Sequence, residues 1–415
     1  MPDNALPKGW RRVPLREVAT IVMGQAPPGS AVVDWNGSTP AAGLPFIQGN
    51  AEFTSGHPVP VKWCTQPGKV AEPGDTLISV RAPVGEMNLA DQRLAIGRGV
   101  AALRFTGINR RFGWHQVAMA RTAFSRIAQG STFTAINSGD LAKLELLTPP
   151  PDEQRRIAEV LDSIDAAIEK TEAVIEATER LRSALLAELL TRGVPGWHTE
   201  WKQAPGIGTI PACWDVVRLG EVLADGPANG LYKPESDYGS GVWIIRITDF
   251  SPGRLERTSF ERVRATAEEL QTYAVAECDI LINRVNSLSH IGKSVLLPQL
   301  AEPAIFESNM MKVRVGQQVL PAYAIEVLCS PATRRYFLAR AKKAVAQASI
   351  NQTDVRQLVV PLPRPEEQRM LVEAIEKLNA RLRTEDDELS RLRVAKAVTA
   401  RALLSGKVRV SGASG

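Results

Sequence analysis

The chain has few of the residues that build metal sites, disulfide frameworks and membrane spans. Its four cysteines lie far apart without a Cys-x-x-Cys pair, which argues against a disulfide framework or a structural zinc site. Its four histidines are isolated in the sequence, with neither metal-ligand nor nucleophile spacing. No run of about 18 apolar residues is present, and the first ten residues include no apolar signal region. These absences predict a cytoplasmic protein with reduced thiols.

Catalytic signatures are also missing. Residues 292–294 (Gly-Lys-Ser) end like a phosphate-binding loop, but Ser287 stands where that loop needs its first glycine. The one acidic-x-Lys triplet, residues 200–202, falls in a Pro/Gly-rich stretch, which disfavours a metal-dependent nuclease core. Neither a glycine-rich cofactor loop nor the Asn/Asp-Pro-Pro-aromatic motif of amino-methyltransferases is found. We therefore expect a binding protein with no catalytic residues, metal or cofactor of its own.

What the chain does contain is an internal duplication. Residues 149–157 (Pro-Pro-Pro-Asp-Glu-Gln-Arg-Arg-Ile) recur 214 positions later as residues 363–371 (Pro-Arg-Pro-Glu-Glu-Gln-Arg-Met-Leu). The same offset relates Leu189 to Leu403, and an offset of 204 relates Trp10 to Trp214. An offset that stays constant over about 55 residues indicates a true repeat rather than similar composition.

Each copy of the repeated motif opens a long helical pattern. Proline before the first turn and acidic residues within it favour a helix start. Apolar residues then follow at alternating spacings of three and four, which is typical of a coiled coil. Each helix would be about 60 Å long at about 1.5 Å per residue, and we expect the two to pair antiparallel; packing of each helix on its own domain is the alternative. The predicted seam comprises Ile157, Leu161, Ile164, Ile168, Ile175, Leu185, Leu189, Leu371, Ile375, Leu378, Leu382, Leu389, Leu392 and Leu403.

The remaining sequence alternates short apolar runs with Gly/Pro clusters, which predicts strand-rich α+β domains. We expect helices over residues 111–127 and 322–346 as well. The predicted fold is therefore two strand-rich α+β domains joined by two long antiparallel coiled-coil helices, with a pseudo-twofold internal repeat. The predicted boundaries are 1–148 for the first domain, 149–194 for the first helix, 195–213 for a linker, 214–362 for the second domain, 363–408 for the second helix and 409–415 for a flexible tail.

Charge is distributed unevenly along the chain. The overall net charge is +5, but residues 152–192 carry −4 and residues 366–407 carry +1, which leaves +8 on the remainder. Lysine and arginine bind polyanions by displacing condensed counterions from phosphates. The excess positive charge on the domains is therefore compatible with a DNA partner, although many other proteins carry as much.

These motifs together resemble the specificity subunit of type I restriction-modification systems over nearly the whole length. Residues 10–18 (Trp-Arg-Arg-Val-Pro-Leu-Arg-Glu-Val) are similar to the family's segment-opening motif, and residues 207–214 (Ile-Gly-Thr-Ile-Pro-Ala-Cys-Trp) to its re-entry motif. Residues 74–81 and 278–284 resemble its internal strand, and the Pro-x-x-Glu-Gln openings resemble its two conserved regions. Cys278 stands where glycine is usual, a departure that we expect to be harmless.

The resemblance implies a DNA-recognition subunit that is not itself an enzyme. Each domain would read one half of a bipartite, asymmetric site in double-stranded DNA, and the helices would set the gap and dock two adenine-methyltransferase (modification) subunits. S-adenosylmethionine would be bound by those partners, and a motor-nuclease subunit would add cleavage. Rod length would then fix half-site spacing, as dimer geometry does in other DNA-binding proteins.

Polar loop residues are the candidates for DNA contact, since base edges and phosphates are bound mainly by Arg, Lys, Asn, Gln, Ser and Thr. Arg81 and Arg284 are expected at equivalent places, where they could instead form structural salt bridges. The candidates in the first domain are Gln25, Gln48, Asn50, Arg81, Ser131, Thr132, Thr134 and Asn137. Those in the second are Arg246, Arg284, Asn286, Asn309, Gln347, Ser349 and Asn351, with Arg340, Lys342 and Lys343 as phosphate contacts.

Two other functions remain open at this point. A coiled-coil scaffold could join partner proteins without reading DNA, but it would gain nothing from two diverged basic domains on a matched pair of helices. A methyltransferase fused to its own reader is disfavoured by the missing cofactor and catalytic motifs.

Overall fold

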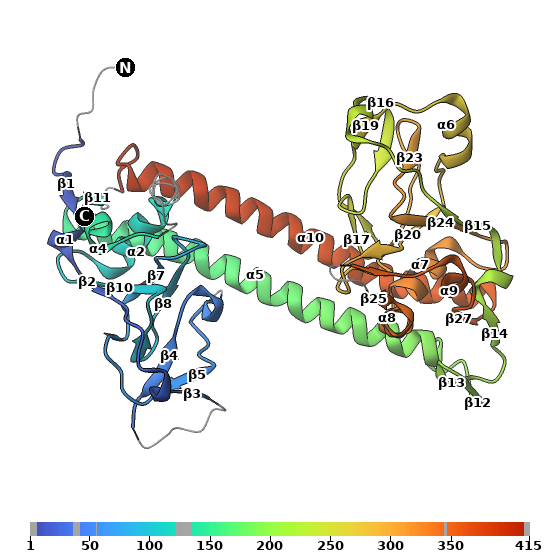
Figure 1. Cartoon of the computed structure of the whole chain (residues 1–415), viewed down its shortest axis with the longest axis horizontal. Helices are drawn as coiled ribbons and strands as arrows, with labels where there is room; N and C mark the ends of the chain where they lie inside the picture. Colours follow the sequence, from blue (N-terminus) through green and yellow to red (C-terminus); the bar gives the residue numbers. More distant parts are fainter. Residues whose placement is uncertain are drawn as a thin grey trace. The chain divides into compact units, whose positions relative to one another are not determined.

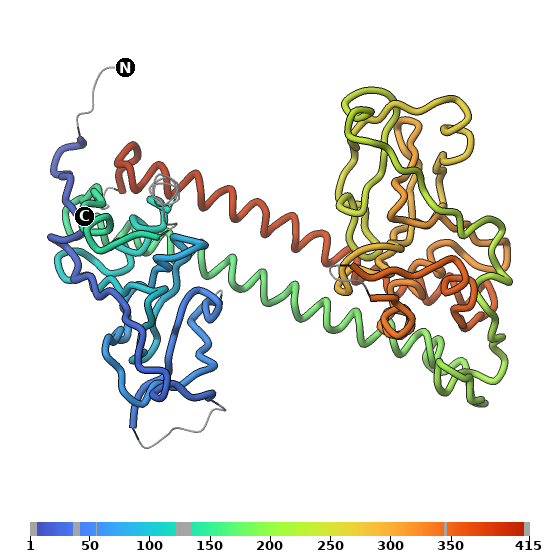
Figure 2. Tube along the Cα trace, in the orientation of Figure 1, coloured from blue at the N-terminus to red at the C-terminus, as the bar shows by residue number. Residues whose placement is uncertain are grey.

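The chain folds into two compact units. The computed structural model describes residues 6–35, 42–54, 56–121, 124, 135–343 and 347–410. Unit 1 comprises Met1–Ala173 and Asp386–Gly415, and unit 2 comprises Val174–Glu385. Two long helices, α5 (Pro151–Arg192) and α10 (Pro365–Leu404), each begin in one unit and end in the other (Figures 1 and 2). Each unit therefore contains one strand-rich segment, the start of the helix that follows it and the end of the other helix.

Unit 1 is built on a four-stranded sheet in the order β2-β10-β7-β8 and a five-stranded sheet in the order β3-β5-β4-β9-β6. A short pair, β1 and β11, closes the domain at the start of α5. Its elements are β1 (Arg11–Pro14), α1 (Leu15–Val18), β2 (Ala19–Met23), η1 (Gly29–Ala31), β3 (Val32–Asp34), β4 (Leu44–Ile47), η2 (Asn50–Glu52), β5 (Lys62–Cys64), β6 (Val70–Ala71), β7 (Thr76–Ser79), β8 (Met87–Leu89), β9 (Leu94–Ile96), β10 (Val100–Phe105), α2 (Arg110–Met119), α4 (Ser138–Ala142) and β11 (Glu145–Thr148).

Unit 2 repeats this plan with sheets in the orders β15-β24-β20-β22 and β19-β16-β23. Its elements are β12 (Trp201–Ala204), β13 (Gly208–Pro211), β14 (Asp215–Arg218), η3 (Leu219–Glu221), β15 (Leu223–Asn229), η4 (Glu235–Asp237), β16 (Tyr238–Ile245), β17 (Phe250–Ser251), β18 (Arg254–Leu255), β19 (Glu261–Val263), α6 (Ala267–Tyr273), β20 (Ile280–Asn283), β21 (Val285–Asn286), β22 (Ser294–Leu296), β23 (Ala304–Phe306), β24 (Met310–Val315), α7 (Pro321–Cys329), α8 (Pro331–Arg340), β25 (Lys342–Lys343), β26 (Ala348–Ser349), α9 (Gln352–Arg356) and β27 (Val359–Leu362).

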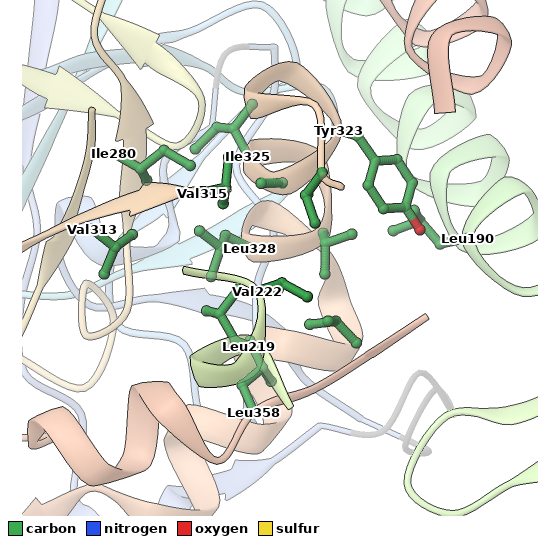
Figure 3. Close-up of a cluster of buried hydrophobic side chains, with 14 of the residues drawn as sticks. Leu190, Leu219, Val222, Ile280, Val313, Val315, Tyr323, Ile325, Leu328 and Leu358 are labelled. Carbon is green, nitrogen blue, oxygen red and sulfur yellow. The ribbon is translucent and has the colours of Figure 1, made fainter. Parts of the chain in front are cut away.

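The main core of unit 2 lies between its four-stranded sheet, α7 and the ends of the two long helices. Ile280 and Val313 of the sheet belong to the same buried cluster as Tyr323 of α7 and Leu190 of α5 (Figure 3). The hydroxyl of Tyr323 donates a 2.9 Å hydrogen bond to the carbonyl oxygen of Pro361, so the one polar atom of this side chain is paired. Burial of apolar area stabilises such a cluster by roughly 25 cal/mol per Å².

The two long helices run antiparallel, as contacts within each unit show. In unit 1, Asp165 pairs with Lys396, and further along α5 Glu172 pairs with Arg393. In unit 2 the guanidinium of Arg182 contacts the side-chain amide of Asn379. The partner's number falls as the residue number on α5 rises, so the helices point in opposite directions. The predicted α+β fold with two long antiparallel helices is confirmed.

Burial varies along the predicted seam. At the helix ends, seam residues belong to the domain cores: Ile157 and Leu403 lie in the core of unit 1, and Leu189 and Leu371 in that of unit 2. Fully buried seam residues are Ile157, Leu161, Leu189, Leu371, Ile375, Leu389 and Leu403; half-buried ones are Ile164, Ile168, Ile175, Leu185, Leu378, Leu382 and Leu392.

The repeated Glu-Gln pair anchors each long helix to its domain. In unit 1 the indole nitrogen of Trp10 donates to Glu153 over 3.3 Å, and in unit 2 that of Trp214 donates to Glu367 over 2.8 Å. The glutamine that follows accepts a backbone hydrogen bond from the segment before α2 or α7 and donates to a carbonyl oxygen at the helix start. A buried carboxylate is tolerated only where such donors surround it, which explains why tryptophan, glutamate and glutamine recur together.

A second repeated anchor precedes the central strands β7 and β20. The buried carboxylate of Asp75 receives two hydrogen bonds from Arg104, 3.0 and 2.7 Å long, and Asp279 receives one of 2.8 Å from Arg314. The residue before each aspartate adopts a left-handed conformation, with φ of 85° at Gly74 and 67° at Cys278. Cys278 is therefore not the harmless departure that we expected, because only glycine adopts this conformation without a steric penalty.

The structure differs from the sequence prediction in two segments of unit 2. The helix expected over residues 322–346 is two helices, α7 and α8, because Ser330 caps the second by accepting a hydrogen bond from the Thr333 amide and Pro331 starts it. Residues 195–213, expected to be a linker, contain the β12–β13 hairpin. Ile210 of this hairpin is fully buried in the core of unit 2.

Two of the histidines that stand alone in the sequence have acidic partners in the fold. His198 lies 2.6 Å from the Glu367 carboxylate through its Nε2 atom and 3.6 Å from the Cys213 sulfur through Nδ1. His115 lies 2.8 Å from Asp162. Among the described residues, none of the helices has the length and apolar character needed to cross a membrane.

Candidate nucleic-acid interface

Unit 1 has a polar cleft where three strand ends meet. Strands β4 and β9 are parallel neighbours, so their carboxyl ends lie side by side. Gln48 directly follows β4, and Arg98 is the second residue after β9. Arg81 comes shortly after β7. The cleft has a volume of about 430 Å³ and is lined by Ala26, Pro27, Val32, Phe46, Gln48, Gly49, Asn50, Lys62, Arg81, Ala82, Gly97, Arg98 and Gly99.

The cleft is positively charged. Lys62, Arg81 and Arg98 line it, and none of the described lining residues is acidic. Within the described part of the chain these three cations form no ion pair, whereas Arg93, Arg104 and Arg111 of the same unit each pair with a carboxylate. Three unneutralised cations beside two amide side chains are suited to bind phosphates and base edges.

Glycines bring the backbone segments around this cleft close together. A Cβ atom on Gly24 would lie 2.1 Å from the carbonyl oxygen of Gly97, and one on Gly99 would lie 2.6 Å from that of Gln48. These distances are shorter than any real Cβ contact, so larger residues at either position would push the cleft walls apart. The tight backbone fixes where Gln48 and Arg98 emerge.

The structure brings several of the predicted residues of unit 1 together. Gln48, Asn50 and Arg81 line the cleft. Gln25 is exposed on the loop beside it, and its backbone amide donates a 3.0 Å hydrogen bond to the Ile96 carbonyl oxygen. The predicted residues Ser131, Thr132 and Thr134 lie outside the described residues.

Unit 2 repeats the backbone of the cleft. In unit 2 the parallel strands β16 and β23 place Ile245 opposite Phe306, and in unit 1 the parallel strands β4 and β9 place Ile47 opposite Ile96 in the same register. The loops that enter the two sites are also equivalent. The Gly24 amide donates to the carbonyl oxygen of the first residue of β10, and the Gly230 amide does the same with the first residue of β24. The two units therefore present different side chains from one scaffold.

The strand exits from β7 and β20 align through a shared hydrogen bond. The amide of Val80 donates to Gly99 over 2.9 Å, and that of Arg284 donates to Asn309 over 2.8 Å. Val80 is therefore the counterpart of Arg284, and the expectation that Arg81 and Arg284 occupy equivalent places is wrong by one residue. The Arg284 side chain donates a 3.1 Å hydrogen bond to the carbonyl oxygen of Ser308 instead of forming a salt bridge with a described residue.

A small three-stranded sheet brings together other predicted residues of unit 2. Strand β26 pairs with both β21 and β25, so Ser349 lies between Val285 and Lys342. The flanking guanidinium of Arg340 covers the ring of Tyr336, with its carbon 3.8 Å from the ring centroid. The predicted residues on or next to this sheet are Arg284, Asn286, Arg340, Lys342, Lys343, Gln347 and Ser349.

Arg246 is held by carboxylates. Its guanidinium donates a 2.7 Å hydrogen bond to Glu261 and lies 3.9 Å from Glu307. The hydrogen bond that Arg246 donates to Glu261 raises the pKa of Arg246, although partial burial opposes the shift. This cation is therefore already neutralised in the folded chain, unlike those of the unit 1 cleft.

Asn137 and Asn351, two further predicted contacts, are helix caps. The side-chain oxygen of Asn137 accepts a 3.0 Å hydrogen bond from the Asp140 amide at the start of α4, and Asn351 does the same with Asp354 at the start of α9. Each aspartate binds back to the asparagine amide, which completes a capping box. Residues 136–140 and 350–354 share an Ile-Asn-x-x-Asp pattern at the same offset of 214, and the two capping boxes explain this repetition.

Sequence reasoning missed Lys62, Arg98 and Tyr232. Arg98 had a usable signal, because it stands between two glycines directly after an apolar run. Lys62 had none, since only the pairing of β5 with β4 brings it to the cleft. Tyr232 is 75% exposed on the loop after β15, which makes it the most exposed large apolar side chain in the described part of unit 2.

One group of side chains has the composition of a metal site. His115, Asp162 and Asp165 place potential ligand atoms within 4.8 Å of one another. Arg111 already binds Asp162 through hydrogen bonds of 2.7 and 3.0 Å, and Lys396 binds Asp165. A metal ion would have to displace both cations, so the residues fit an ion-pair network between α2 and the long helices better than a metal centre.

Comparisons with known proteins bear on this chain at the level of family and fold. The model of the type I restriction modification DNA specificity domain matches residues 7–179 and again residues 211–393. The type I restriction enzyme EcoKI specificity subunit of Escherichia coli is 24% identical over 92% of this chain and 84% of its own length. The MjaX specificity subunit of Methanocaldococcus jannaschii is 35% identical, but that match spans 45% of this chain and 44% of the relative.

Solved structures show the same fold. The type I restriction-modification S subunit from M. genitalium superposes with a TM-score of 0.57 at 16% identity, over 97% of both chains. A chain from a structure of a type I R-M system superposes with a TM-score of 0.54 at 19% identity, over 98% of this chain and all of that one. At these identities the likeness establishes the architecture.

Proposed function

Because the chain belongs to the type I restriction-modification DNA specificity family, we propose that each of its two units reads one half of a split, asymmetric DNA site. Specificity subunits of this family recognise DNA and are not enzymes; methylation and restriction are done by partner subunits. The single observation that carries the proposal for this chain is the shared scaffold with different side chains. Two domains that bind different half-sites need the same backbone scaffold but different side chains on their binding surfaces.

The proposed DNA contacts come from the loops and strand ends already described. In unit 1 the unpaired cations and amides of the cleft would bind phosphates and base edges. In unit 2 the small sheet and the neighbouring loop would do so. The residues proposed are Gln25, Gln48, Asn50, Lys62, Arg81 and Arg98 in unit 1, and Arg284, Asn286, Asn309, Arg340, Lys342, Lys343, Gln347 and Ser349 in unit 2.

The long helices would set the gap between the two half-sites. Helices of 42 and 40 residues each extend over about 60 Å at about 1.5 Å per residue, a length comparable to almost two turns of DNA. The buried anchors at the start of each helix, Glu153 and Glu367, support a fixed spacing because they resist rotation of a domain about its helix.

Family members assemble with methyltransferase and restriction subunits. For this chain we propose two methyltransferase subunits, one for each copy of the internal repeat, because a duplicated mount presents two equivalent surfaces. S-adenosylmethionine would be bound by those partners, and a restriction subunit would add cleavage. The compartment proposed is the cytoplasm, where bacterial and archaeal chromosomal DNA lies.

The decisive test is a genome-wide map of methylated adenine in the host, with and without this gene. Loss of one split, asymmetric motif on deletion is the expected result. Replacing residues 1–148 with the same segment of another family member should then change one half of the motif and leave the other half and the gap intact. A map that does not change on deletion, in cells that express the partner genes, would refute the proposal and favour a scaffold that reads no DNA.

A further inference from the structure

Five pairs of side chains occupy equivalent positions in the unit 1 cleft and in the matching part of unit 2. We call these two regions the reading surfaces. The parallel strand pairs and the glycine loops fix the alignment of the two backbones. In addition, Phe46 lies opposite Lys62 in the antiparallel pair β4–β5, and Ile244 lies opposite Glu261 in β16–β19. The equivalent pairs are Ala26 and Tyr232, Gln48 and Arg246, Lys62 and Glu261, Arg81 and Val285, and Arg98 and Ser308.

The two sets differ in chemistry. Unit 1 has three cations at these positions, without an ion pair to any described residue. In unit 2 the remaining cation, Arg246, is bound to the Glu261 carboxylate, and an aromatic ring stands in the place of Ala26. With little free positive charge at these five positions, this part of unit 2 must obtain more of its binding from contacts other than phosphate neutralisation.

Tyr232 is presented by a backbone that is held on both sides. The preceding amide, that of Leu231, donates a 2.9 Å hydrogen bond to the Phe306 carbonyl oxygen. A Cβ atom on Gly230 would lie 2.2 Å from the Glu307 carbonyl oxygen, so this backbone passes directly against β23 and its exit. The following residue, Lys233, is bound to Glu269 over 2.7 Å.

The Tyr232 ring is largely exposed. Tyr232 is 75% exposed, and its hydroxyl has no hydrogen-bond partner among the described residues. An exposed ring on a fixed loop contributes almost nothing to the folded core, but aromatic side chains bind nucleic acids by stacking on bases or by insertion between base steps.

We propose that the five equivalent positions determine which bases each unit prefers, and that the Tyr232 ring contacts a base of the half-site bound by unit 2. This inference rests on the proposed function, since it requires unit 2 to bind DNA. It adds a division of chemistry at these five positions: cations without an ion pair to a described residue dominate in unit 1, and an aromatic contact dominates in unit 2.

The experiment compares variants of the full chain, assembled with its methyltransferase subunit, by selection of bound sequences from randomised DNA. Tyr232→Ala should lower the affinity of the complex for its selected site by about 5- to 150-fold, the range expected for loss of one base–aromatic contact. It should also relax the selected bases in one half of the split motif. Tyr232→Phe should retain the preference, because it keeps the ring. Arg98→Ala should affect the opposite half.

Two further variants complete the design. Trp197→Ala is the matched control, because it removes an aromatic side chain of unit 2 that is 47% exposed but lies outside the reading surface; neither half should change. Ala26→Tyr introduces a ring at the equivalent position of unit 1 and should alter only that unit's half-site.

The outcomes separate the inference from the function on which it rests. Tyr232→Ala with both halves unchanged, or Tyr232→Phe as defective as Tyr232→Ala, would overturn the ring contact while the wild-type complex still selects a split motif. A wild-type complex that selects no split motif would refute the proposed function itself. Unchanged melting of the Tyr232 variants, expected from its exposure, excludes loss of the fold as the cause.

Discussion

Replacing Cys278 by glycine should stabilise the chain. Cys278 adopts a φ of 67° directly before the buried Asp279. A left-handed conformation costs a non-glycine residue about 1–2 kcal/mol, whereas glycine loses roughly 0.5–1 kcal/mol in backbone entropy on folding. The cysteine side chain is exposed, so little packing is lost with it. The difference predicts a gain of about 0.5–1 kcal/mol in the free energy of unfolding.

The equivalent turn of unit 1 allows the opposite substitution to be tested, because it has a glycine at this position. Gly74 has a φ of 85°, and a Cβ atom there would lie 2.9 Å from the Arg110 guanidinium. Gly74→Ala should therefore lower the free energy of unfolding by about 0.5–1 kcal/mol, because the strain exceeds the entropy that is saved. Cys278→Ala is the second control: it removes the thiol but keeps the strained backbone, and should change stability by less than about 0.5 kcal/mol.

Urea unfolding of the full chain measures these differences. A rise in the midpoint with an unchanged slope reports stability rather than a change in compactness. A midpoint for Cys278→Gly that is equal to or below that of the wild type would refute the strain argument. An equal gain for Cys278→Ala would also refute it, because removal of the thiol alone would then account for the effect.

Three further predictions follow from the anchors, the cleft and the caps. Glu367→Ala should lower the free energy of unfolding in urea by about 3–5 kcal/mol, because it leaves buried donors such as the Trp214 indole without an acceptor. Truncation of the exposed Glu366 is the control and should lower it by less than about 0.5 kcal/mol. Equal losses would contradict the anchor role. Changing Lys62 and Arg98 together to glutamine should reduce the slope of log binding constant against log salt by about 2, and an unchanged slope would remove them from the interface. Asn351→Ala should lower the free energy of unfolding by about 1 kcal/mol and leave the selected DNA motif unchanged; a changed motif would make this cap a base contact as well.

The anchors of the fold could be predicted from the sequence because they leave repeated signals. The Glu-Gln pairs, the tryptophans and the Asn-x-x-Asp boxes recur at constant offsets, since each must satisfy the same buried hydrogen bonds in both units. Their repetition in the sequence alone predicts the duplication and the two long helices. The conformation at Cys278 left no such signal, because only a backbone angle shows why glycine is preferred there.

The reading positions left weaker signals because they are assembled from separate strands. Lys62 reaches the cleft through the pairing of β5 with β4, and Arg98 through the parallel pairing of β4 with β9. Neither pairing can be deduced from the alternation of apolar and polar residues along one strand. A parallel neighbour in particular can be identified only when the order of strands in the whole sheet is known. Arg81 and Gln48 were predicted because each follows a strand with an obvious apolar run.

The same physical distinction explains how one protein can keep its architecture while its target changes. Glu153 and Glu367 are buried among donors, so substitution at either position would leave those donors unpaired at a cost of several kcal/mol. Tyr232 and Arg98 are exposed on backbone that other residues hold in place, and surface changes of that kind usually alter stability by less than about 0.5 kcal/mol. Sequence change is therefore least costly at the positions that we propose to face the DNA, and two copies of one scaffold can diverge there without loss of the fold.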